Sequence, residues 1–572
     1  MIRKIVQIND TSALSIRIPY NPVDMEDPRT VIHLLTAEPA ELNSLNTCQA
    51  DPDAINTWVA ALPMANLYAS TTQVLELVDE LCRLRTDYLT RLELLESVRS
   101  TVYYMCARIE RQTVPGGTRW TPQLEQAQLL QQKLATGYKN VVLAALPICN
   151  EDKSAREAVI NGLHRAISDL SRVLLRSHRH YLTPDPGIWL HLNQLFHITR
   201  FCGLAEQKVR DSANHNQAPT TIMEAWMRPV LLALAKPNQL RPMELNQLFN
   251  ALEIWSNQAE VRPAESKDLF TVDLQQDRPP ASTGQVRSSP VLLGLNTEVL
   301  AYELEAFLRE IPSSVVVPEF IGAKVLQHVA AAWSTAQVRH HQRLPLAESV
   351  EIGIGLRVAA ACFAHEIETA RTKSSAEQTA GNTRADAPAP VNGPPVHTTA
   401  ARDTSPLGFN VKWPEGLPAS AQIGELLSVK EASSNQWRIG VLRWIGGSKG
   451  GAATTGVELL SPTAVPVSAR VVKTKGGSTG FAKALLLPAL PAMQRPASLI
   501  TPRVPFQPMQ KIQIQRGRTQ SNIHLGSCIG QTENYNQFSF RMLGSYLENQ
   551  PTGLTMKALT QTHGAIRPTN GK

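Results

Sequence analysis

Residues 402–413 read RDTSPLGFNVKW, and this stretch decides the fold expected for the C-terminal part of the chain. Asp403, Ser405 and Gly408 are typical of a tight turn, because Asp and Ser cap backbone N–H groups and glycine tolerates unusual backbone angles. The alternation of apolar and polar residues in the FNVKW that follows predicts a β-strand with one buried face. We therefore expect this turn to lie within an antiparallel β-structure.

Short strand-like runs continue to the C-terminus, separated by turns rich in Gly, Pro, Ser and Asn. The predicted strands span residues 423–430, 437–444, 456–460, 467–473, 481–487, 497–501, 509–515, 521–529 and 537–542. Their spacing of about 8–12 residues is typical of a barrel or sandwich. The sequence therefore predicts a β-domain over 402–465, a second small β unit over 466–560 and a tail over 561–572.

The N-terminal part carries a different pattern. Apolar residues recur at three-to-four spacing in residues 72–109, which predicts one buried stripe on a helix. Similar patterns predict an all-α bundle or α-solenoid over 51–372, with an inserted loop or hairpin near 261–290. Residues 1–50 are expected to be an N-terminal arm with short strands.

A boundary separates the two halves. Residues 373–401 are rich in Ala, Pro, Thr, Ser and Gly and almost lack large apolar side chains. Burial cannot offset the entropy of ordering such a segment, so the composition predicts a flexible linker.

Composition and targeting signals narrow the class of protein. The chain has 572 residues, 43% of them hydrophobic, and its seven cysteines form no C-x-x-C pair. This argues against a disulfide framework and fits a reducing compartment. No signal peptide and no membrane span is recognisable, so the expected localisation is cytoplasmic.

The charge is unevenly distributed. Residues 403–572 hold 18 Lys or Arg and 7 Asp or Glu, a net charge of +11, whereas the rest of the chain is at −4. A local positive field favours anionic ligands.

No motif points to catalysis. The glycine-rich loops at 446–451 and 476–480 do not fit a phosphate-binding loop. The spacings among His178, His180, His191 and His197 are not those of a helical metal site. We therefore expect no enzyme activity, no catalytic residue, no metal and no cofactor.

The order of motifs after residue 402 resembles a PilZ domain. The D-x-S-x-x-G turn is followed by a strand, then by IGELLSVK, WRIGVLRWIGG and TGVELL, over about residues 402–462. The resemblance implies a small β-barrel, and the whole chain is similar to uncharacterised proteobacterial PilZ-like proteins.

The resemblance also implies a ligand, cyclic di-GMP, which PilZ domains bind through the D/N-x-S-x-x-G turn and an upstream R-x-x-x-R arm. The arginines at 371, 384 and 402 have no partner four residues on, so a degenerate site without that arm is expected. The candidate ligand-binding residues are Arg402, Asp403, Ser405, Gly408, Lys412, Arg438 and Arg443.

Three functions follow from these observations. The first is a bacterial signalling adaptor, a weak or degenerate cyclic di-GMP receptor whose helical domain contacts a protein partner. The second is a scaffold that joins proteins and binds no nucleotide. The third is a nucleic-acid-binding protein that uses the basic C-terminal module, which the scattered basic residues do not favour.

Overall fold

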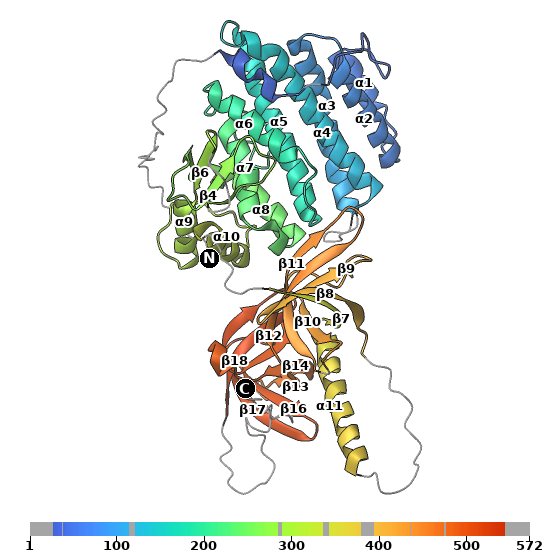
Figure 1. The fold of residues 1–572 in the computed structure, drawn as a ribbon, viewed down its shortest axis with the longest axis vertical. Coiled ribbons are helices and arrows are strands. Elements are labelled where there is room, and N and C mark those ends of the chain that lie inside the picture. Colours follow the sequence, from blue (N-terminus) through green and yellow to red (C-terminus); the bar gives the residue numbers. More distant parts are fainter. Residues whose placement is uncertain are drawn as a thin grey trace.

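The computed structural model describes residues 27–36, 38–113, 120–283, 289–335, 343–378, 394–434, 436–473 and 476–543. Figure 1 shows a helical part at one end of an elongated molecule and two β-barrels toward the other. The multidomain fold class predicted from the sequence is thereby confirmed. The first 26 residues of the predicted N-terminal arm lie outside the described residues.

The N-terminal part is helical because amphipathic segments are separated by strong capping residues. Thr121 caps one helix through Leu124 N, with Pro122 in the first turn, and Thr221 and Glu224 form a capping box on another. The α-helices are α1 (Pro52–Ala60), α2 (Leu67–Arg83), α3 (Tyr88–Gln112), α4 (Pro122–Ala145), α5 (Lys153–Arg179), α6 (Ile188–Phe201), α7 (Ile222–Leu234), α8 (Pro242–Trp255), α9 (Glu298–Leu308) and α10 (Ala323–Ser334). Short 3-10 helices are η1 (Pro28–Leu34), η2 (Leu146–Ile148), η3 (Pro237–Gln239) and η4 (Ser256–Gln258). None of the helices in the described part is both long and apolar enough to cross a membrane.

The insert predicted near 261–290 is a small antiparallel sheet. Its strands are β3 (Glu260–Pro263), β4 (Phe270–Asp273), β5 (Ala281–Ser282) and β6 (Leu292–Asn296), in the order β3-β6-β4-β5. A separate two-stranded sheet is formed by β1 (Lys208–Val209) and β2 (Thr220–Thr221). Buried apolar residues of β3, β4 and β6 join one core with the helices, so the insert belongs to the helical domain.

A buried ionic network ties the long helices together. Arg99 donates to both oxygens of Asp211 at 2.8 and 2.9 Å, and the two side chains are 5% and 1% exposed. Burial alone would raise the pKa of Asp211, but Arg99 and Arg165 outweigh it and hold that pKa well below its usual range. The pair therefore depends on both partners, since either one alone would be a buried, uncompensated charge.

The buried histidine of α5 predicts a pH effect on stability. Burial lowers the pKa of His164 to about 3, and its Nε2 lies 2.8 Å from Thr220 Oγ1. Below about pH 6.5 His164 is protonated in the unfolded chain but stays neutral in the folded chain. Stability is therefore lost as the pH falls from 6.5 toward 3. From pH 7 to 5 we expect the unfolding free energy to fall about 2 kcal/mol further in the wild type than in His164→Gln. Equal losses in denaturant titrations of the two proteins would contradict this account.

The first barrel is closed by six strands, in the order β10-β11-β12-β9-β8-β7. These are β7 (Leu344–Ile354), β8 (His397–Ser405), β9 (Gly408–Trp413), β10 (Leu426–Glu431), β11 (Arg438–Gly447) and β12 (Ala453–Ser461). The barrel thus begins well before the predicted boundary at residue 402, and the predicted helical domain, 51–372, includes β7. This prediction missed β7 because a long insertion separates it from its partner β8.

That insertion holds α11 (Leu356–Gln378), which covers part of the stretch predicted to be a flexible linker. Residues 379–393 lie outside the described residues, and β8 takes up the end of the predicted linker. The prediction of an unstructured segment throughout 373–401 is therefore corrected at both of its ends.

The second β unit is also a closed barrel, in the order β13-β14-β15-β18-β17-β16. Its strands are β13 (Val465–Val471), β14 (Ala482–Leu487), β15 (Ser498–Pro502), β16 (Lys511–Arg516), β17 (Thr519–Gln531) and β18 (Tyr535–Met542). Residues 544–572, which include the predicted tail, lie outside the described residues. The start of α11 packs between the two barrels through Ala359, Cys362 and Phe363, and Figure 1 shows the helix beside β10, β13 and β14.

The helical domain is anchored to the first barrel by the turn after α5. Tyr181 is 5% exposed and packs with the barrel core, while its hydroxyl donates to Leu240 O at 3.1 Å. The backbone N–H of Gly447, at the end of β11, donates to Tyr181 O at 2.8 Å. Lys449 beyond that strand pairs with Glu125 and Asp185. β11 therefore connects the barrel wall directly to the helical domain.

Candidate ligand-binding site

The D-x-S-x-x-G segment forms the hairpin between β8 and β9. Ser405 pairs with Gly408 across the turn, and Ser405 Oγ donates to Gly408 O at 3.5 Å. A Cβ atom on Gly408 would lie 2.1 Å from Val457 O on β12. Of the two reasons for a glycine here, close backbone approach and a positive φ angle, the structure shows the first, because Gly408 is not among the positive-φ glycines.

Asp403 is held by two neighbours that the sequence reading did not select. Arg343 Nη1 donates to Asp403 Oδ1 at 2.7 Å, and Asn410 Nδ2 donates to Asp403 Oδ2 at 2.9 Å. The contact arises because Arg343 directly precedes β7, where Pro345 pairs with Asp403. Asn410 Oδ1 is buried and has no hydrogen-bond partner in the described structure.

Arg343 corrects the expectation that the arginine pair is missing. Residues 339–343 read RHHQR, so the R-x-x-x-R spacing is present in the sequence. The expectation rested on the arginines at 371, 384 and 402. The strand that lies beside Asp403 instead comes about sixty residues earlier in the chain. Arg339 itself lies outside the described residues.

A tryptophan extends the same surface. Asn410 pairs with Gly456 on β12, and Gly456 pairs with Trp444 on β11. A Cβ atom on Gly456 would lie 1.8 Å from Trp444 Nε1, so the indole rests directly on the Gly456 backbone. Asn410 lies between the core residues Phe409 and Val411, so this row of side chains faces outward from the barrel.

The three tryptophans of this barrel therefore differ. Trp413 and Trp437 are 4% and 5% exposed, as core residues are. Trp444 is only half-buried. Its partly open ring is separated from Asn410 only by the Gly456 backbone.

The other candidate residues are more dispersed. Arg443 pairs with Glu458 at 2.6 Å. Because Glu458 lies directly opposite Gly408 on the neighbouring strand, this ion pair borders the turn. Arg438 pairs with Glu431 at 2.8 Å and lies over the Phe409 ring. Arg402 is exposed at a register shift in β8, and exposed Lys412 lies four residues along β9 from Gly408. The structure thus groups Asp403, Ser405, Gly408 and Arg443, and adds Arg343, Asn410 and Trp444.

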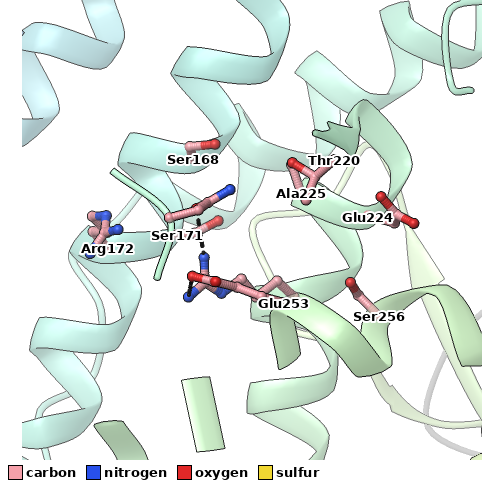
Figure 2. A pocket seen from close by; sticks show the side chains of 10 residues that line it. Ser168, Ser171, Arg172, Thr220, Glu224, Ala225, Glu253 and Ser256 are labelled. Carbon is pink, nitrogen blue, oxygen red and sulfur yellow. Dashed lines mark hydrogen bonds and ion pairs between the residues drawn. The ribbon is translucent and has the colours of Figure 1, made fainter. Parts of the chain in front are cut away.

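Two hollows of the described structure lie in the helical domain. Figure 2 shows the smaller, whose lining includes Arg172 of α5, Thr220 of β2, Glu224 of α7 and Glu253 of α8. Glu253 already accepts from His215 N, Asn216 N and Arg228. Burial lowers the pKa of Arg228 to about 9, although Glu253 opposes the shift. Arg172 donates to Ala213 O and Glu224 accepts from Thr221 N, so these charged groups have protein partners, and no metal-binding cluster occurs among the described residues.

Comparison with known proteins covers almost the whole chain. Three models of one family match: "Cyclic-di-GMP receptor FimW, N-terminal domain" at residues 53–265, "Cyclic-di-GMP receptor FimW, middle PilZ domain" at 269–363 and 357–466, and "FimW C-terminal beta-barrel domain" at 467–543. The chain belongs to the FimW family. Its resemblance to a PilZ domain is therefore confirmed.

One curated relative extends this match. Cyclic-di-GMP receptor FimW of Pseudomonas aeruginosa is 28% identical, over 90% of this chain and 94% of the relative. The FimW middle-domain match includes all of β7 and the sheet strands from β4 onward, well upstream of the predicted start of the PilZ-like domain. No solved structure matches this chain.

Proposed function

We propose that this chain is a cyclic di-GMP receptor that acts as a bacterial signalling adaptor and not as an enzyme. The observation that carries the proposal is the contact between Arg343 and Asp403, which joins the second arginine of the R-x-x-x-R spacing to the D-x-S-x-x-G turn. The FimW relative, whose name states that it is a cyclic di-GMP receptor, supports the choice of ligand.

The geometry suits a cyclic dinucleotide. A guanidinium carries five N–H donors, and Asp403 takes one from Arg343, so other donors are left for a phosphate. Asp403 orients this guanidinium, and Arg343 is 37% exposed, so a ligand can reach it. Trp444 offers its ring face to a guanine, and Asn410 Oδ1 is an acceptor still without a donor.

The local charge supports a site in which binding depends on the positions of individual arginines more than on a general positive field. Residues 403–464 hold five Lys or Arg and five Asp or Glu, so this part of the barrel is neutral. The arginines named above must therefore supply the attraction for two phosphates. Because R-x-x-x-R is present in the sequence, we expect ordinary affinity, and not the weak binding that a missing arm implied.

The ligand surface is also connected to the rest of the molecule. Trp444 stands three residues before Gly447, whose N–H donates to Tyr181 O of the helical domain. A nucleotide that shifts or stiffens this end of β11 would change the seat of Tyr181. This supports an adaptor in which ligand binding to the barrel changes the helical domain, and the helical domain contacts the protein partners.

The test is a calorimetric titration of the full chain with cyclic di-GMP, with cyclic di-AMP and GTP as comparators. We expect saturable binding of cyclic di-GMP with a Kd of about 1 µM or below. Trp444→Ala should weaken binding by about 1–3 kcal/mol, the usual worth of base stacking. Tyr302→Ala, which removes an aromatic ring that is 67% exposed on α9, should have no effect. A folded chain that binds no cyclic di-GMP at millimolar concentration would leave the scaffold function instead.

A further inference from the structure

The basic charge of the C-terminal region belongs to the second barrel. Residues 465–543 hold ten Lys or Arg, and Glu533 is their one acidic residue. Two of the arginines are neutralised, because Arg495 pairs with Glu458 and Arg503 pairs with Glu533. Among the described residues, Lys473, Lys483, Lys511, Arg518 and Arg541 make no ion pair. This field therefore lies apart from the proposed nucleotide site.

Part of this charge forms an ordered row on the barrel wall. Lys511 pairs with His524, and His524 pairs with Arg541, so the three residues stand side by side on β16, β17 and β18. Their neighbours Ile512, Ile523 and Leu525 are buried, which places the row on the outer face. Lys511 and Arg541 are exposed, and His524 stands between them on β17. Directly opposite side chains on adjacent strands are about 5 Å apart.

The next two rows carry polar groups without a negative charge. Gln513 pairs with Asn522, and Gln515 pairs with Gln520. Arg470 on β13 pairs with Gln513, and its Nε donates to Gln513 Oε1 at 2.8 Å. The outer faces of β16 and β17 thus carry cations and carboxamides, and Arg541 extends this surface onto β18.

Exposed apolar side chains lie in the loop before β16. Met509 is 70% exposed, and its N–H donates to Leu525 O, next to His524. Val504 is 81% exposed at the other end of this loop, where Arg503 pairs with Glu533 and its carbonyl oxygen accepts from Asn536. Methionine and arginine are enriched at protein interfaces, where an apolar centre is flanked by polar groups.

We propose that the outer face of β16, β17 and β18, with the loop that carries Val504 and Met509, docks an acidic protein segment that also presents apolar side chains. The positive charge of this surface favours a partner with acidic side chains, and exposed Met509 and Val504 favour a partner that also has apolar side chains. Single-stranded nucleic acid fits less well, because Phe481, the exposed aromatic ring in the described part of this barrel, is stacked against Arg470. A membrane fits less well because carboxamides, not apolar residues, fill the rows beside the cations.

The experiment uses the full chain and a fluorescent peptide built from Glu, Asp and Leu. Lys511→Glu with Arg541→Glu reverses two charges of the row, and Lys511→Gln with Arg541→Gln removes them more mildly. Lys153→Glu with Arg309→Glu is the matched control, because these side chains are 90% and 69% exposed in the helical domain.

We expect the wild type to bind the peptide, and the row reversal to lower its affinity roughly tenfold or more. The neutral variant should fall between, the control should stay near wild type, and all should bind cyclic di-GMP unchanged. Equal losses in the row and control variants, or no peptide binding by the wild type, would overturn the proposal. So would tighter, row-dependent binding of oligouridylate or of phosphatidylglycerol vesicles. If the wild type failed to bind cyclic di-GMP, that result would contradict the proposed function and would not affect the docking surface.

Discussion

Arg343→Ala is expected to weaken cyclic di-GMP binding by roughly ten- to hundredfold while the chain stays folded. The guanidinium is held by Asp403 at 2.7 Å and retains free N–H donors for a phosphate. A charge-assisted hydrogen bond contributes about 1.5–3 kcal/mol, which corresponds to this loss of affinity. Calorimetric titration of the variant and the wild type measures the change.

The same titration can show whether Arg343 and Asp403 act together. Asp403→Ala should also weaken binding, because Arg343 loses the carboxylate that orients it. The double variant should then lose less than the sum of the two single losses, since the residues share one interaction. Arg503→Ala is the matched control, because Arg503 makes a similar exposed ion pair, with Glu533 at 2.9 Å, on the second barrel. Binding that survives both single changes would place the nucleotide elsewhere.

Arg99→Met should destabilise the helical domain by about 3–5 kcal/mol. The change leaves Asp211, whose side chain is 1% exposed, as a buried carboxylate that has lost its main partner. Arg165 remains, but its Nη1 lies 3.5 Å from Asp211 Oδ2 and it also serves Glu96. Urea unfolding followed by the helical circular dichroism signal measures the loss.

An exposed ion pair provides the control for this change. Arg309→Met removes the pair with Glu305, at 3.2 Å on α9, in which the two side chains are 69% and 41% exposed. Solvent screens such pairs, so a loss below about 0.5 kcal/mol is expected. If Arg99→Met costs no more than Arg309→Met, the buried network does not hold the helices together in the way inferred here.

Local patterns were enough to predict the type of most elements. Three-to-four spacing in residues 72–109 predicted one helix, and the structure has two there, α2 and α3, separated by residues 84–87. Short alternating runs after residue 402 predicted two β units, and each closes into a six-stranded barrel. The turn at Asp403, Ser405 and Gly408 was recognised as well, because its spacing is complete within six residues.

The site and the charge surface depended on pairings between distant residues. β7 joins β8 across an insertion that includes α11, so Arg343 meets Asp403 although sixty positions separate them. Similarly, Asn410 and Trp444 flank Gly456 only because β9, β12 and β11 are neighbours in the closed barrel. The row of Lys511, His524 and Arg541 likewise requires the register of three strands.

The sequence by itself determined the type of most helices and strands, since burial periodicity and capping act within a few residues, but it did not reveal β7 or α11. It also determined the PilZ-like turn and the excess of positive charge near the C-terminus. Only the tertiary structure decided which arginine faces Asp403, which tryptophan stays open and which barrel carries the unpaired cations. Strand order and register set these neighbours, and both arise from closing a barrel around a shared core, which no local pattern encodes.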